Sequence, residues 1–134
     1  MRVLTKKQSK IIDKISIDNY KISQESLMTA AANGIVKLIE KYSLFINKKP
    51  RILIICGKGN NGGDAICAAN ILIRKDYDIH AHFLIKKNKI SSLSRKYYQE
   101  YIKVSDQISF GSEFKKYNGF DLLIDGLMGI GFRG

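Results

Sequence analysis

Residues 51–64 read RILIICGKGNNGGD, and this stretch decides the fold of the chain. Its first part, Arg51 to Cys56, is a continuous apolar run rich in β-branched residues, which is typical of a strand buried on both faces of a parallel sheet. Its second part, 57–63, places the pattern G-x-G-x-x-G directly after that strand, and helical periodicity follows from Asp64. A strand, a glycine loop and a helix in this order predict a βαβ unit.

The rest of the chain continues this alternation. We expect further strands at 78–85, 108–110 and 122–125, and helical segments at 64–75, 91–104 and 113–117. This spacing predicts an α/β fold. Its core is a Rossmann-like parallel sheet with strand order 3-2-1-4 in three α/β/α layers.

The segment before Pro50 has helical patterns rather than strand patterns. One covers 5–17, and a second runs from an N-cap at Ser23 or Ser26 to Phe45. We therefore predict a single domain, 1–134, in which a helical arm (1–49) precedes the Rossmann-like core (50–134).

The composition limits the classes of function that the protein can have. The 134 residues hold 23 basic and 12 acidic side chains, a net charge of +11. A basic surface suggests a nucleic-acid-binding protein, but 18 of the bases are lysines, only five are arginines, and they are spread along the chain. A general bias of the composition towards lysine, in a protein with an ordinary fold, explains the net charge better than nucleic-acid binding does. No apolar run reaches the ~18 residues of a membrane-spanning helix, and the free thiols Cys56 and Cys67 suit a reducing cytoplasm.

A second glycine loop, DGLMGIGFRG, occupies 125–134. With strand order 3-2-1-4, the loops after the first and fourth strands diverge at a topological switch point, where ligands bind. Asn61 and Asp125 are therefore expected to face each other across one crevice. Their amide and carboxylate oxygens suit a hard cation.

The loops do not form an ordinary dehydrogenase site. Such a site needs an acidic residue near the end of the second strand to bind the ribose, whereas Asp78 lies at the start of that strand. The strand is instead followed by Lys86, Lys87 and Lys89. These lysines could meet the ribose phosphate of NADP, although a solvated charge run is the simpler interpretation.

At these residues the sequence resembles the NAD(P)H-hydrate epimerase family. The family loop G-x-G-N-N-G-G-D-G appears at 57–65 with Ala65 in place of the last glycine, and the family pattern D-A-x-x-G-x-G appears from Asp125. Leu27-Met28-x-x-Ala31 also resembles the family's N-terminal helix, with Ala32 where a glycine is usual.

The resemblance implies an isomerase that interconverts the R and S epimers of hydrated NADH and NADPH, with a companion dehydratase completing the repair. It implies a potassium ion held by Asn61 and Asp125. Family members associate, so it also implies a possible homodimer, while the cytoplasmic location rests on the free thiols. The residues expected to contact the substrate are Asn60, Asn61, Gly62, Gly63, Asp64, Gly129, Ile130, Gly131, Phe132, Arg133 and Gly134.

The sequence departs from the family at its C-terminal end. Family members continue into a strand with a D-x-P-S-G motif, whose Asp contacts the substrate and whose Ser completes the ion site. Neither residue is present here, so the catalytic group is unassigned and Asp64 is the remaining candidate. We therefore expect a C-terminally truncated chain that lacks half of the sheet, with little epimerase activity and a fourth strand left as an apolar edge.

Two other functions remain open from the sequence. One is a non-catalytic nucleotide-binding or interaction module, which would not need the missing Asp of the D-x-P-S-G motif. The other is a basic nucleic-acid-binding protein. An NAD(P) dehydrogenase is the least favoured, because no residue supports hydride transfer.

Overall fold

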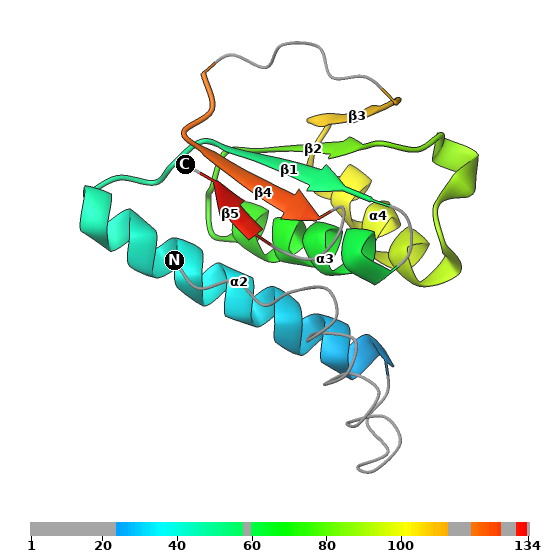
Figure 1. Ribbon diagram of the computed structural model, residues 1–134, viewed down its shortest axis with the longest axis horizontal. Coiled ribbons are helices and arrows are strands. Elements are labelled where there is room, and N and C mark those ends of the chain that lie inside the picture. Colours follow the sequence, from blue (N-terminus) through cyan, green and yellow to red (C-terminus); the bar gives the residue numbers. More distant parts are fainter. Residues whose placement is uncertain (1–23, 58–59, 113–118, 127–130, 134) are drawn as a thin grey trace.

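Figure 1 shows the computed structural model of the protein, which describes residues 24–57, 60–112, 119–126 and 131–133. The strands are β1 (Ile52–Cys56), β2 (Ile79–Phe83), β3 (Ile108–Phe110), β4 (Leu122–Gly126) and β5 (Gly131–Arg133). The helices are α2 (Gln24–Ile46), α3 (Asn60–Arg74), the short 3-10 helix η1 (Lys87–Lys89) and α4 (Ser92–Val104).

The strands form one sheet in the order β3-β2-β1-β4-β5. The first four are parallel, so the predicted order 3-2-1-4 and the Rossmann-like α/β class are confirmed. β1 lies at the centre and is buried along its whole length, as its continuous apolar run predicts. The expected strand 78–85 is shorter in the structure, and the expected strand 122–125 extends to Gly126.

The described helices lie on one side of the sheet, where α3 packs between α2 and α4 (Figure 1). Right-handed crossovers explain this, because β1 to β2 and β2 to β3 step in the same direction and place α3 and α4 on one face. α2 begins at Gln24, so the alternative N-cap Ser26 is wrong, since that residue lies inside the helix. Ser23 and the helical patterns expected at 5–17 and 113–117 lie outside the described residues.

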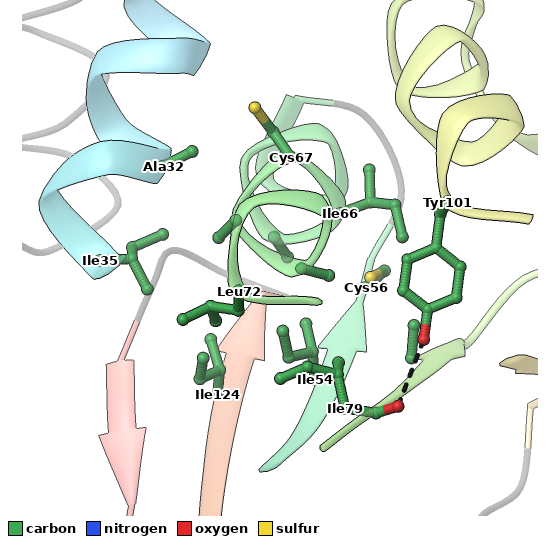
Figure 2. Packing of buried hydrophobic residues seen from close by; sticks show 14 of the residues in the cluster. Ala32, Ile35, Ile54, Cys56, Ile66, Cys67, Leu72, Ile79, Tyr101 and Ile124 are labelled. Carbon is green, nitrogen blue, oxygen red and sulfur yellow. Dashed lines mark hydrogen bonds between the residues drawn. The ribbon is translucent and has the colours of Figure 1, made fainter. Parts of the chain in front are cut away.

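The core lies between the sheet and α3. Figure 2 shows Leu72 of α3 beside Ile54 of β1 and Ile124 of β4, and all three side chains are fully buried. On α3, the small residues at 65, 68 and 69 are also buried, which lets the helix approach the sheet closely. Tyr101 brings α4 into the same core, and its hydroxyl donates to the Gln107 carbonyl oxygen at 2.5 Å. Burial raises the pKa of Tyr101 to about 12.

The prediction that the fourth strand is an unpaired edge of the sheet is wrong. β5 pairs antiparallel with β4 in the register Leu123↔Arg133, Ile124↔Phe132 and Asp125↔Gly131. The strand takes up three residues of a segment that we expected to be loop, because pairing satisfies the backbone groups of β4 that would otherwise lie open.

Two histidines connect β2 to β3. Ser109 Oγ lies 2.9 Å from His80 Nε2 and 2.6 Å from His82 Nδ1, and His82 Nε2 lies 3.1 Å from the carbonyl oxygen of Gly111. His80 also lies 3.4 Å from Gln107 Oε1 and packs edge-on to Phe120. His82 is buried. The pair thus stabilises the β2–β3 pairing.

The environment of His80 predicts a pH-dependent stability. Burial lowers the pKa of His80 from its usual 6.5, and the charges of His82 and Arg51 lower it further, against the Gln107 hydrogen bond that raises it. The unfolded chain therefore takes up this proton at a higher pH than the folded chain, so stability is complete above pH 6.5 and falls as the pH drops below it. Urea unfolding between pH 7.5 and 5.5 measures the decrease. In the His80→Gln variant the decrease should be smaller, and an equal decrease in both proteins would contradict this assignment.

Candidate functional site

The carboxyl ends of β1 and β4 meet at one edge of the sheet. β1 and β4 pair in parallel with Ile55 opposite Asp125 and Cys56 opposite Gly126. One residue further, the Gly57 N–H donates to the Gly126 carbonyl oxygen at 3.1 Å. The starts of the two glycine loops are therefore joined directly through the backbone, at the switch point that the strand order creates.

The turn from β1 into α3 is very tight. A Cβ atom added at Gly62 would lie 2.1 Å from the Gly57 carbonyl oxygen, a distance that no side-chain movement can relieve because the neighbour is backbone. Gly62 is therefore required for the loop to close onto the first turn of α3.

Gly63 has a different structural role. A Cβ atom there would lie 2.4 Å from Met28 Cε of α2 and 3.0 Å from Ser94 Oγ of α4. A side chain at this position would therefore have to displace the end of the Met28 side chain. The sequence did not reveal this role, since Met28 and Ser94 are far from the loop along the chain.

Two carboxylates belong to this edge of the sheet. Asp125 is on β4, with its side chain half-buried and alternating with the fully buried Ile124, so the two side chains point to opposite faces of the sheet. Asp64 is half-buried on α3, one residue after the glycines. Its charge helps burial to raise the pKa of the nearby Cys67 thiol to about 11, so this thiol stays protonated at neutral pH.

The structure describes some of the other predicted site residues only in part. Asn60 and Asn61 open helix α3, immediately beside the Gly57–Gly126 junction, and only their backbone is described. The backbone of 131–133 forms β5 rather than a loop. Gly129, Ile130 and Gly134 lie outside the described residues. The placement of Asn61 opposite Asp125, and the assignment of the remaining residues to a substrate, therefore stay predictions.

In the described ranges, those of this edge included, no group of three or more His, Cys, Asp or Glu residues is close enough to hold a metal ion. Cys56 and Cys67 are free thiols, as predicted, and both are buried. No helix within the described part is long and apolar enough to cross a membrane.

One shallow hollow lies away from the glycine loops. It has a volume of about 660 Å³, and it is lined by Ile102, Lys103, Val104, Ser105, Asp106 and Ile108. These residues end α4 and begin β3, so the hollow lies at the amino ends of the parallel strands, whereas the glycine loops lie at the carboxyl ends. In doubly wound sheets ligands bind at the carboxyl ends, and the candidate site is therefore the β1–β4 edge.

The family model described as YjeF-related protein N-terminus matches residues 24–134, which include every described element. The chain belongs to this family. Both glycine loops lie within the matched range, so the family assignment covers the candidate site as well as the sheet.

Curated relatives of this YjeF-related chain are named as NAD(P)H-hydrate epimerases or as bifunctional NAD(P)H-hydrate repair enzymes. It is 28% identical over 137 residues to the NAD(P)H-hydrate epimerase of Dictyostelium discoideum, covering 100% of the chain and 57% of that protein. It is 33% identical to the NAD(P)H-hydrate epimerase of Plasmodium knowlesi, covering 92% of the chain and 42% of the relative. A "Bifunctional NAD(P)H-hydrate repair enzyme Nnr" from Moorella thermoacetica is 28% identical over 141 residues, and the match covers 100% of this chain and 27% of that protein.

A solved structure confirms the fold of the YjeF-related domain. The crystal structure of yeast ynu0 (YNL200c) superposes with a TM-score of 0.74 over 95% of this chain and 56% of the yeast chain, at 17% sequence identity. At that identity the likeness shows the fold alone. The chain thus spans between about a quarter and three fifths of the relatives compared here.

Proposed function

We propose that this chain binds NAD(P)H-hydrate at the β1–β4 edge and takes part in interconverting its R and S epimers. The observation that carries the proposal is the direct joining of the two glycine loops, through the Gly57–Gly126 hydrogen bond and the Ile55↔Asp125 register. Glycine loops before a helix leave backbone N–H groups free to bind phosphates. The names of the curated relatives support a hydrated nicotinamide nucleotide as the ligand.

The chemistry of the residues also suits a potassium ion. Asp125 offers a carboxylate, and the carbonyl oxygens at the ends of β1 and β4 are hard donors of the kind that alkali and alkaline-earth cations prefer. We propose that Asp125 and Asn61 would hold the ion. A bound cation would reduce the repulsion between Asp125 and the phosphates of the nucleotide.

Epimerisation requires a proton donor and acceptor at the hydrated ring. Asp64 is our candidate for that role, because it is the half-buried carboxylate of α3 that directly follows the glycine loop. Interconversion of the epimers would then let a companion dehydratase repair either one, in keeping with the bifunctional name of the Moorella relative.

Isothermal titration with purified NADPH-hydrate, in potassium and then in sodium buffer, tests the proposal. We expect saturable binding with one site per chain that is tighter in potassium. A parallel stereospecific assay distinguishes an active epimerase from a non-catalytic nucleotide-binding module. Binding without conversion of the R epimer would indicate the module. The absence of saturable binding in either buffer would contradict the proposal itself.

A further inference from the structure

A cluster of three lysines follows β2 and lies outside the site described above. Lys86, Lys87 and Lys89 are all exposed, and no ion pair involving them occurs among the residues that the structure describes. The sequence between Asp78 and Glu100 contains no acidic residue at all. These ammonium groups therefore form a locally unneutralised positive cluster, which we call the β2 lysine cluster.

The fold holds this cluster next to the first glycine loop. The Leu84 N–H donates to the Cys56 carbonyl oxygen at 3.1 Å, so the chain leaving β2 stays paired with the last residue of β1. Cys56 directly precedes Gly57, whose N–H donates a hydrogen bond to the Gly126 carbonyl oxygen. The end of β2 thus lies at the same edge of the sheet as the ends of β1 and β4 (Figure 1).

The cluster is anchored at its far end as well. The Lys89 N–H donates to the Lys86 carbonyl oxygen at 2.8 Å, which closes the turn of η1. The next residue, Ile90, is buried, and the Ser91 side chain then caps α4 by accepting from the Ser94 N–H. The backbone that carries the lysines is therefore fixed between β2 and α4, and Lys87 Nζ lies 6.0 Å from the ring centre of Tyr98.

The residue type at the end of the second strand distinguishes nicotinamide nucleotides in sheets of this kind. An acidic residue there accepts from the 2′-hydroxyl of NAD, whereas a basic residue accommodates the 2′-phosphate of NADP. In this chain, Asp78 lies at the opposite end of β2 and pairs with Arg51 at 3.1 Å. The carboxyl end of β2 instead has three lysines, which can neutralise a phosphate monoester as point charges.

The geometry points to the β2 lysine cluster as a subsite for the 2′-phosphate, which makes the chain selective for NADPH-derived over NADH-derived nucleotides. This inference rests on the proposed function, because it assumes that the pyrophosphate lies on the glycine loop. We expect 2′-phospho-ADP-ribose to bind about tenfold more tightly than ADP-ribose, which corresponds to about 1.4 kcal/mol.

A triple variant tests the subsite. In Lys86→Ala/Lys87→Ala/Lys89→Ala, isothermal titration should give similar dissociation constants for 2′-phospho-ADP-ribose and ADP-ribose, with ADP-ribose affinity within about twofold of the parent. The matched control is Lys37→Ala/Lys41→Ala/Lys103→Ala, which removes the same charge from exposed positions on α2 and α4. This control should keep the preference. Raising the salt from 0.05 to 0.5 M should weaken the preference in the parent, because exposed charges are screened.

The outcomes separate the inference from the proposed function. Equal binding of both nucleotides by the parent, or an unchanged preference in the first variant, would overturn the lysine subsite and leave the proposed function standing. Loss of the preference in the control variant would also overturn it, since the effect would then come from net charge. Inorganic phosphate that competes with 2′-phospho-ADP-ribose but not with ADP-ribose would support the subsite. If neither nucleotide nor NADPH-hydrate binds the parent, the proposed function fails.

Discussion

Gly62→Ala should destabilise the protein by at least about 2 kcal/mol, because overpacking usually costs roughly 1–3 kcal/mol and the neighbouring atom here is backbone. The reason is steric, because the new Cβ atom would lie 2.1 Å from the Gly57 carbonyl oxygen and would force the two backbones apart. The same movement would open the Gly57–Gly126 junction, so nucleotide binding should be lost as well. Urea unfolding at pH 7.5 measures the change in the free energy of unfolding.

Gly34→Ala is the matched control for this substitution. Gly34 lies on the exposed face of α2, and a Cβ atom there meets nothing within 4 Å. Alanine is favoured over glycine inside a helix by about 1 kcal/mol, so this variant should be more stable than the parent. If Gly62→Ala were as stable as Gly34→Ala, the close approach of α3 to the β1 loop would be contradicted.

Asp125→Asn should weaken the binding of NADPH-hydrate more than tenfold and should remove its dependence on potassium, because a neutral amide replaces the carboxylate that we propose for the ion. The fold should be little affected, since the side chain is only half-buried at the end of β4 and the substitution preserves its shape. Isothermal titration in potassium and sodium buffers measures both effects.

Asp121→Asn provides the comparison. Asp121 immediately precedes the same strand at its opposite end, where its carboxylate accepts from the Arg51 N–H at 2.9 Å and pairs with Lys48 at 3.3 Å. These partners lower the pKa of Asp121, so this variant should lose some stability but keep its potassium-dependent binding. Potassium dependence that survived in Asp125→Asn would remove Asp125 from the proposed ion site.

The central architecture could be predicted because it depends on patterns that are local along the chain. The continuous apolar run at 52–56 and the shorter one at 122–124 indicate strands of a parallel sheet, and the helices between strands require right-handed crossovers. The glycine loop between a strand and a helix indicates a doubly wound sheet, whose usual order 3-2-1-4 brings the two glycine loops to one edge.

Other features could not be predicted because their causes are distant in the sequence. The three residues of β5 have no strand pattern of their own, and only pairing with β4 defines them. Gly63 looked like part of a phosphate loop, but its close neighbours are side-chain atoms of Met28 and Ser94 on two other helices. The tight contact between Gly62 and Gly57 likewise becomes visible only once the backbone is folded.

In our proposal the ends of β1 and β4 form one binding site for NAD(P)H-hydrate. The most direct test is to follow the backbone amide resonances of the labelled protein during a titration with NADPH-hydrate. We expect saturable shifts at Gly57, Gly62, Asp64 and Asp125, and none at the hollow near Ile102 and Ile108. Shifts confined to that hollow, or no saturable shifts at all, would contradict the proposal.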